Sequence, residues 1–136
     1  MQWLLIAILA FDLASIKTEP NLEKRSELAL DNAGTALDQA REAYNSGDVS
    51  KMEFALHEVE ASVELAFQAL TDTGKDARRN PKFFKKAELK TRELIRRLEG
   101  VREIVSYQDR ALVEIVRDRV AEVHDNLLKG IMSKKK

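Results

Sequence analysis

Two histidines and many carboxylates are the groups that could do chemistry in this 136-residue chain, because it contains no cysteine. If the surrounding segment is helical, His57 lies on the same side as Glu53, Glu60 and Glu64. An imidazole among carboxylates can bind a metal ion. Di-iron helical bundles, however, place Glu-x-x-His motifs on two helices, and this sequence contains no such motif. We therefore expect a solvated ion pair at His57, and we predict neither a metal site nor a cofactor.

The second histidine, His124, lies at the edge of an apolar pattern that includes Val120 and Val123. This position predicts a partly buried imidazole that bonds to a neighbouring side chain. The sequence contains no phosphate-binding loop, dinucleotide-binding glycine pattern, nucleophile elbow or zinc-binding His–Glu helix. The lack of cysteine also excludes a thiolate nucleophile and a disulfide scaffold. We predict no catalytic residues and a protein that is not an enzyme.

Charge is separated along the chain although its formal net charge is zero. Residues 19–72 contain 12 acidic and 4 basic residues, for a net charge of −8, whereas residues 73–136 contain 18 basic and 10 acidic residues, for +8. One hypothesis is a polyanion-binding face for nucleic acid or an anionic membrane surface. The alternatives are that the two halves attract each other within one bundle, which the zero net charge favours, or between two copies. The candidate polyanion-binding residues are Lys82, Lys85, Lys86, Lys90, Arg96 and Arg97.

Long helices must position these side chains. Charged residues make up 34% of the chain and apolar residues 44%, with five glycines and two prolines, a composition typical of long helices. Apolar residues recur at alternating spacings of three and four in four segments, which predicts side-by-side, coiled-coil-like packing. These apolar series run from Leu30 to Tyr44, from Met52 to Leu70, from Phe84 to Val105 and from Val113 to Ile131.

Turn residues separate the four expected helices. Gly47 and Asp48 predict a left-handed turn followed by a helix cap. Asn80 and Pro81 predict an Asn cap and a helix start after the longest loop, and residues 106–109 resemble a capping box. We therefore predict an all-α fold, an up-down antiparallel bundle of about four helices preceded by a short hydrophobic N-terminal segment.

Residues 1–15 are that segment. Trp3–Phe11 is an unbroken apolar run, too short to cross a bilayer but similar in length to the centre of a signal peptide. The alternative is an apolar segment that docks on the bundle. We expect residues 19–132 to form one helical-bundle domain and residues 133–136 a solvated basic tail. An exported protein, periplasmic or extracellular, is the first prediction, and a cytoplasmic protein follows if the segment is not a signal peptide.

A second apolar series marks the back of the second expected helix. It consists of Phe54, Ala61 and Leu65, which we call the Phe54 strip. It is either a surface for a protein partner or a contact with another part of the fold. No specific function is readable from the sequence. We predict a bundle that acts through protein–protein contacts as an adaptor or structural component, with self-association as one form of contact and no evident small-molecule substrate. The alternative is a polyanion-binding module.

Overall fold

The computed structural model of the protein describes residues 13–133. Its long helices are α2 (Leu22–Asn45), α3 (Val49–Asp72), α4 (Pro81–Ile104) and α5 (Arg110–Met132), and a 3-10 helix, η1 (Tyr107–Asp109), precedes α5. A short helical segment at residues 13–17 precedes α2. The described residues contain no strand. The predicted all-α bundle is therefore confirmed.

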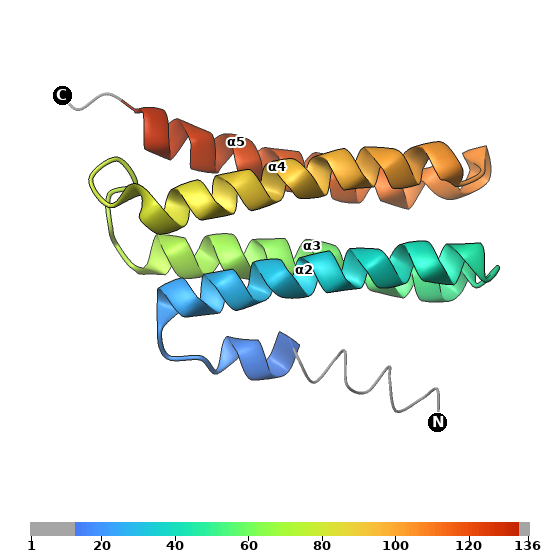
Figure 1. Ribbon diagram of the computed structural model, residues 1–136, viewed down its shortest axis with the longest axis horizontal. Helices are drawn as coiled ribbons and strands as arrows, with labels where there is room; N and C mark the ends of the chain where they lie inside the picture. The colour runs from blue at the N-terminus through green and yellow to red at the C-terminus, as the bar shows by residue number, and fades with distance from the viewer. Residues whose placement is uncertain (1–12, 134–136) are drawn as a thin grey trace.

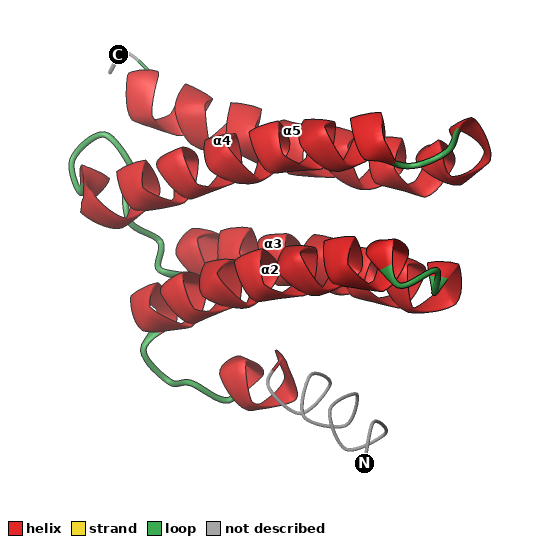
Figure 2. Cartoon of the chain, turned by 45° about the vertical axis from the view of Figure 1, so that its right-hand side comes forward, coloured by secondary structure: helices red, strands yellow, loops and turns green. Residues whose placement is uncertain are grey.

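The helices form two stacked hairpins. Figures 1 and 2 show α4 and α5 as one layer above α2 and α3, with residues 13–17 on the far side of the α2–α3 layer. Successive helices alternate in direction, as predicted. Across the layers, α4 lies over α2 and α5 lies over α3. Lys86 pairs with Glu27 and Arg97 with Asp38, both 59 residues apart in the sequence, so α2 and α4 run parallel and in register.

Helix ends follow the local sequence in the first hairpin. The Asn21 side chain accepts a hydrogen bond from the Lys24 backbone N–H at 3.0 Å and so caps α2. Gly47 has a φ of 81°, the left-handed conformation that favours glycine. Asp48 accepts from the Lys51 N–H at 3.0 Å, which caps α3 as predicted.

The second hairpin departs from two predicted caps. Pro81 begins α4 as expected, but the Asn80 side chain makes no cap bond and instead donates to the Asp76 carbonyl at 3.4 Å. Ser106 donates its hydroxyl hydrogen to the Asp109 carboxylate at 2.9 Å rather than completing a capping box with the backbone. The reason is local: residues 107–109 form a 3-10 turn, which brings these two side chains together before α5 begins.

The four predicted apolar series line the core. Met52, Leu56, Leu94, Leu98 and Val113 are fully buried, as are most members of each series. Helix α2 adds a second series in which every member is alanine. Its members are buried and follow spacings of four and three: Ala29, Ala33, Ala36, Ala40 and Ala43. Alanine lets two helix backbones approach closely, and α2 and α3 have the most extensive contact of any helix pair.

Residues 13–17, the described end of the N-terminal segment, pack against the bundle. Leu13 is 9% exposed and Ile16 packs against the core. Trp3–Phe11 and residues 134–136 lie outside the described residues. Within residues 13–133, none of the helices is both long enough and apolar enough to span a bilayer.

Candidate functional site

The Phe54 strip has two differently placed ends. Phe54 is 45% exposed and Ala61 is exposed, whereas Leu65 is partly buried and packs against the core. Ala61 and Leu65 line a shallow surface groove together with Lys17, the last residue of the short N-terminal helical segment. The two hypotheses for the strip therefore apply to different residues. Leu65 packs against other parts of the fold, whereas the Phe54 ring is exposed to solvent and accessible to a partner.

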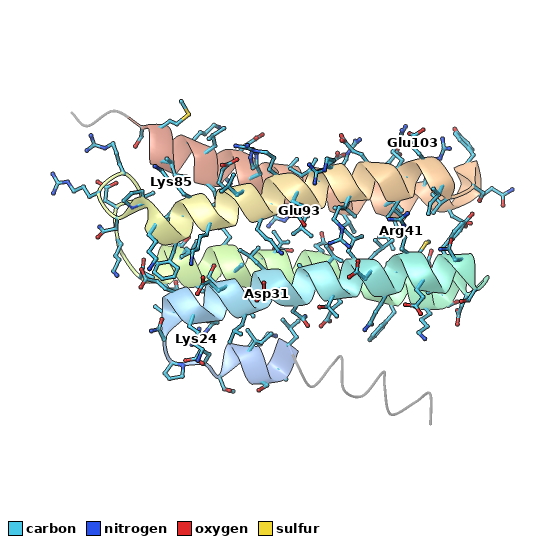
Figure 3. The ribbon with its side chains drawn as sticks, in the orientation of Figure 1. Lys24, Asp31, Arg41, Lys85, Glu93 and Glu103 are labelled. Atoms are coloured by element: carbon cyan, nitrogen blue, oxygen red, sulfur yellow. The ribbon has the colours of Figure 1, made fainter. Side chains whose placement is uncertain are left out.

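The six candidate polyanion-binding residues do not form one free basic surface. Lys86 Nζ lies 2.9 Å from Glu27 Oε2, and Arg97 forms an ion pair with Asp38. Both pairs join α4 to α2, where charged side chains of the two layers meet (Figure 3). The acidic and basic halves of the sequence therefore contact each other within the bundle.

The other four basic residues remain available. Within residues 13–133, the amino and guanidinium groups of Lys82, Lys85, Lys90 and Arg96 have no carboxylate partner within 4.0 Å. The Lys82 ammonium group lies 5.2 Å from the centre of the Phe83 ring, and that of Lys86 lies 5.3 Å from it. These cation–π contacts hold two of the lysines against the protein surface.

A charged cluster around the buried Glu88 side chain links α4 to α5. Glu88 is 6% exposed, and its Oε2 atom lies 2.7 Å from His124 Nε2 and 2.7 Å from Arg92 Nη2. Burial alone raises the pKa of Glu88, but hydrogen bonds from His124 and Arg92 outweigh it and hold the pKa below its ordinary value. A second link joins Arg102 Nε to Glu114 Oε2 at 2.6 Å.

The sequence predicted a bonded His124 but not its partner. Glu88 is 36 residues away in the sequence, and only the antiparallel register of α4 and α5 brings the two together. The signal that could have found Glu88 is its place next to Ala87, a member of the predicted apolar series. A carboxylate beside such a series within a helix needs a partner, because an isolated buried charge is costly.

The first histidine has no comparable surroundings. His57 is exposed, and Glu64 pairs with Arg119 of α5 at 2.8 Å rather than with the imidazole. In the part of the chain that the structure describes, no group of three or more histidine or carboxylate side chains is close enough to hold a metal ion.

A scan against protein-family models, a search of curated proteins and a search of solved structures each gave no match for this chain.

Proposed function

We propose that this protein is a non-enzymatic helical bundle that is exported and acts through protein–protein contacts, as an adaptor or structural component. The observation that supports this most directly is the exposed ring of Phe54 on α3. Phe67 of the same helix packs against the core, so the helix has an interior position for one aromatic ring and leaves the other in solvent. Exposed aromatic side chains are enriched at the centres of protein interfaces.

The contact surface in this proposal is the outer half of the Phe54 strip, formed by Phe54 and Ala61. Ala61 is small and exposed, and it lies about two helical turns after Phe54 on the same face of α3. A partner side chain can therefore reach the helix surface between them. A partner with an apolar ridge, such as an amphipathic helix, fits this surface.

Site-specific photo-crosslinking in living cells tests this surface. A photoreactive phenylalanine analogue in place of Phe54 is expected to give a discrete crosslinked protein band. The same analogue at Asp31, an exposed position of α2, serves as the matched control. The band should disappear when Ala61→Lys is added to the Phe54 probe. A Phe54 probe that gives the same pattern as the Asp31 probe would contradict the proposal.

Export is proposed from the apolar run Trp3–Phe11, and cell fractionation with intact-mass measurement tests it. The proposal expects a species about 14 or 15 residues shorter than the full chain, recovered outside the cytoplasm. An uncut species in the cytoplasm supports the alternative, in which the segment belongs to the fold. The packing of Leu13 and Ile16 is the observation that favours this alternative.

Polyanion binding is the second candidate function, because Lys82, Lys85, Lys90 and Arg96 lack carboxylate partners in residues 13–133. Titration with duplex DNA and with vesicles containing anionic lipid tests it. Neutralising several phosphates makes affinity fall steeply with salt. Binding that is absent, or that is flat with salt, would reject this candidate.

A further inference from the structure

We propose that one end of the bundle, the end that carries the loop at residues 73–80, docks on a lipid bilayer that contains anionic lipids. This inference rests on the second candidate function, polyanion binding, and deepens it. It names the polyanion, and it moves the contact from the side of α4 to the end of the bundle. It does not involve Phe54, which lies near the start of α3 at the opposite end.

Segments far apart in the sequence meet at this end of the molecule. Figures 1 and 2 show there the start of α2, the end of α3, the loop at residues 73–80, the start of α4 and the end of α5. Figure 3 labels Lys24 and Lys85 at the same end. The fold therefore gathers onto one surface basic residues that lie in separate parts of the sequence.

The two ends of the bundle carry net charges of opposite sign. We call residues 19–27, 70–86 and 127–133 the basic end, and they contain nine basic and five acidic residues, for a net charge of +4. Residues 40–54 and 99–114 form the opposite end and contain four basic and seven acidic residues, for −3. A negatively charged surface therefore attracts one end and repels the other, which orients the helices away from that surface.

Most acidic residues of the basic end already have a basic partner there. Four such pairs have a nitrogen and an oxygen within 4.0 Å of each other: Glu19–Lys24, Glu23–Lys75, Glu27–Lys86 and Asp76–Arg79. The fifth acidic residue, Asp72, accepts a hydrogen bond from the Gln68 side chain at 2.8 Å. These pairs leave a surplus of positive charge at this end.

The surplus lies on side chains that an outside anion can reach. Arg25 donates to the Glu19 carbonyl at 2.7 Å. The other four basic residues have no carboxylate within 4.0 Å among residues 13–133, and they are Arg78, Lys82, Lys85 and Lys129. Three of these are exposed, and Arg78 is half-buried. They extend from the loop over the first turn of α4 to the last turn of α5, so they can bind several phosphates at once.

An exposed apolar side chain at the same end favours a bilayer as the partner. Met132 is the last residue of α5 and is 70% exposed, and Lys129 lies one turn before it. Three further lysines, residues 134–136, follow in the sequence. At a bilayer surface, lysine ammonium groups meet the phosphates while a neighbouring apolar side chain enters the boundary with the acyl chains. The phosphate surface of a nucleic acid has no such apolar layer.

Two further observations disfavour a nucleic acid. The Phe83 ring is half-buried and lies about 5 Å below two lysine ammonium groups, so it is not free to stack on bases. A duplex that follows α4 beyond its first turns would meet Glu93, Glu99 and Glu103, of which the last two are exposed. A bilayer in contact with the end of the bundle meets none of these carboxylates.

Sedimentation of the full chain with vesicles tests the proposal. Vesicles of phosphatidylcholine alone are compared with vesicles that contain about 30% phosphatidylglycerol, at about 100 mM NaCl. Each basic residue near an anionic leaflet raises the partition coefficient by about fivefold, so the four unpaired ones should raise it by about 100-fold or more. This increase should disappear near 500 mM NaCl, at about one-half the screening length. The uncharged vesicles measure the separate contribution of the apolar run Trp3–Phe11.

A matched pair of double variants locates the contact. Lys82→Gln with Lys85→Gln should lower the partition coefficient on anionic vesicles by about 25-fold. Arg41→Gln with Lys51→Gln removes the same charge from exposed positions at the opposite end and should lower it by less than about threefold. The 24 residues of α4 separate the two ends by about 36 Å, which is several screening lengths. Thermal unfolding shows that both variants keep the fold.

A third variant separates this inference from the second candidate function. If Lys90→Gln with Arg96→Gln, on the side of α4, loses more vesicle binding than Lys82→Gln with Lys85→Gln, the end-on contact is wrong and polyanion binding stands. Duplex DNA that binds as tightly as the anionic vesicles would overturn the bilayer as the partner. Equal binding to the two vesicle compositions would also overturn it, and if duplex DNA does not bind either, the second candidate function fails as well.

A polarity-sensitive dye on single-cysteine variants tests the orientation, because the chain has no cysteine of its own. On anionic vesicles, emission from the dye on Met132→Cys should shift to shorter wavelength. The control is Ser46→Cys, an exposed position at the opposite end, and its emission should not change. Equal shifts at the two positions would rule out docking through the basic end.

Discussion

The α2–α3 hairpin and the α4–α5 hairpin have helices of nearly equal length, but the first buries many more alanines than the second, beside large side chains such as Met52 and Leu56. In α2, five alanines form a buried series beside Leu30 and Leu37. In α4 and α5, leucine, valine and phenylalanine dominate the buried positions. The polar links also differ. Asn32 donates to Ser62 at 2.9 Å and to Glu58 at 2.9 Å, whereas the second hairpin uses the charged Glu88–His124 contact.

These differences predict which substitutions, and which pH, destabilise each hairpin. Close backbone approach in the first hairpin leaves little room for added atoms, so enlargement should be costly there. The second hairpin buries one alanine and otherwise mostly leucine and valine, so truncation should be the costlier change there. The Asn32–Ser62 hydrogen bond joins two groups that do not titrate, whereas the Glu88–His124 contact is lost when the Glu88 carboxylate becomes protonated.

Truncation in the second hairpin has the largest expected effect. Leu98 of α4 is fully buried, and Leu98→Ala should lower the free energy of unfolding by about 2–5 kcal/mol. Leu89→Ala on the same helix is the matched control, because Leu89 is 56% exposed and should lose about 0.5 kcal/mol or less. Urea unfolding measures both. A loss below about 1 kcal/mol at Leu98 would show that this hairpin repacks freely.

Enlargement in the first hairpin comes next. Ala33 is fully buried in the alanine series of α2, and Ala33→Leu should cost about 1–3 kcal/mol by forcing α2 and α3 apart. Ala121→Leu on α5, at a half-buried alanine, should be tolerated better. Thermal unfolding of the pair gives the comparison. If both variants lose the same stability, the two hairpins do not differ in the way proposed.

The sequence predicted the helices, most turns and the apolar series, because all of these depend on residues close together in the chain. The buried members of those series, such as Met52 and Leu98, follow from periodicity alone. The pairing of α2 with α4 and of Glu88 with His124 could not be predicted in the same way. It depends on the stacking of the two hairpins and on the register within the second, which no local pattern specifies. The placement of Leu65 against the core likewise required the tertiary structure.

Acid should affect the second hairpin through Glu88. Its pKa lies below the ordinary value near 4.5, so its contribution to stability is present above about pH 4.5 and is lost as the pH falls through the pKa of the folded state. Glu88→Gln should therefore lower the free energy of unfolding by about 1–2 kcal/mol at neutral pH. The difference in this free energy between the variant and the wild type should become smaller toward pH 3.

Urea unfolding between pH 3 and pH 7 measures this effect. Glu99→Gln, at an exposed position of α4, controls for the removal of one negative charge. If the difference in the free energy of unfolding between wild type and Glu88→Gln stays constant over this range, the cluster does not stabilise the hairpin through the charged form of Glu88.

Substitutions at the two ends of the Phe54 strip should differ less in their effect on stability, within the first hairpin alone. Leu65 is partly buried against the core, so Leu65→Lys should cost about 1 kcal/mol. Phe54 is 45% exposed, so Phe54→Lys should change stability by about 0.5 kcal/mol or less. Thermal melts of the single and double variants measure this. If Phe54→Lys unfolds the protein, its ring belongs to the core and cannot serve as a partner surface.

The ion pairs between the layers should contribute least. Lys86 is 53% exposed and Glu27 is 41% exposed, and solvent screens a pair of this kind, so a double-mutant cycle of Lys86→Ala and Glu27→Ala should give a coupling of about 0.5 kcal/mol or less. The separation of charge along the chain would then select which helices face each other without holding them together, because Leu37, Leu94 and their apolar neighbours supply the attraction. A coupling above about 1.5 kcal/mol would reverse this ranking and make the charges a principal link between the hairpins.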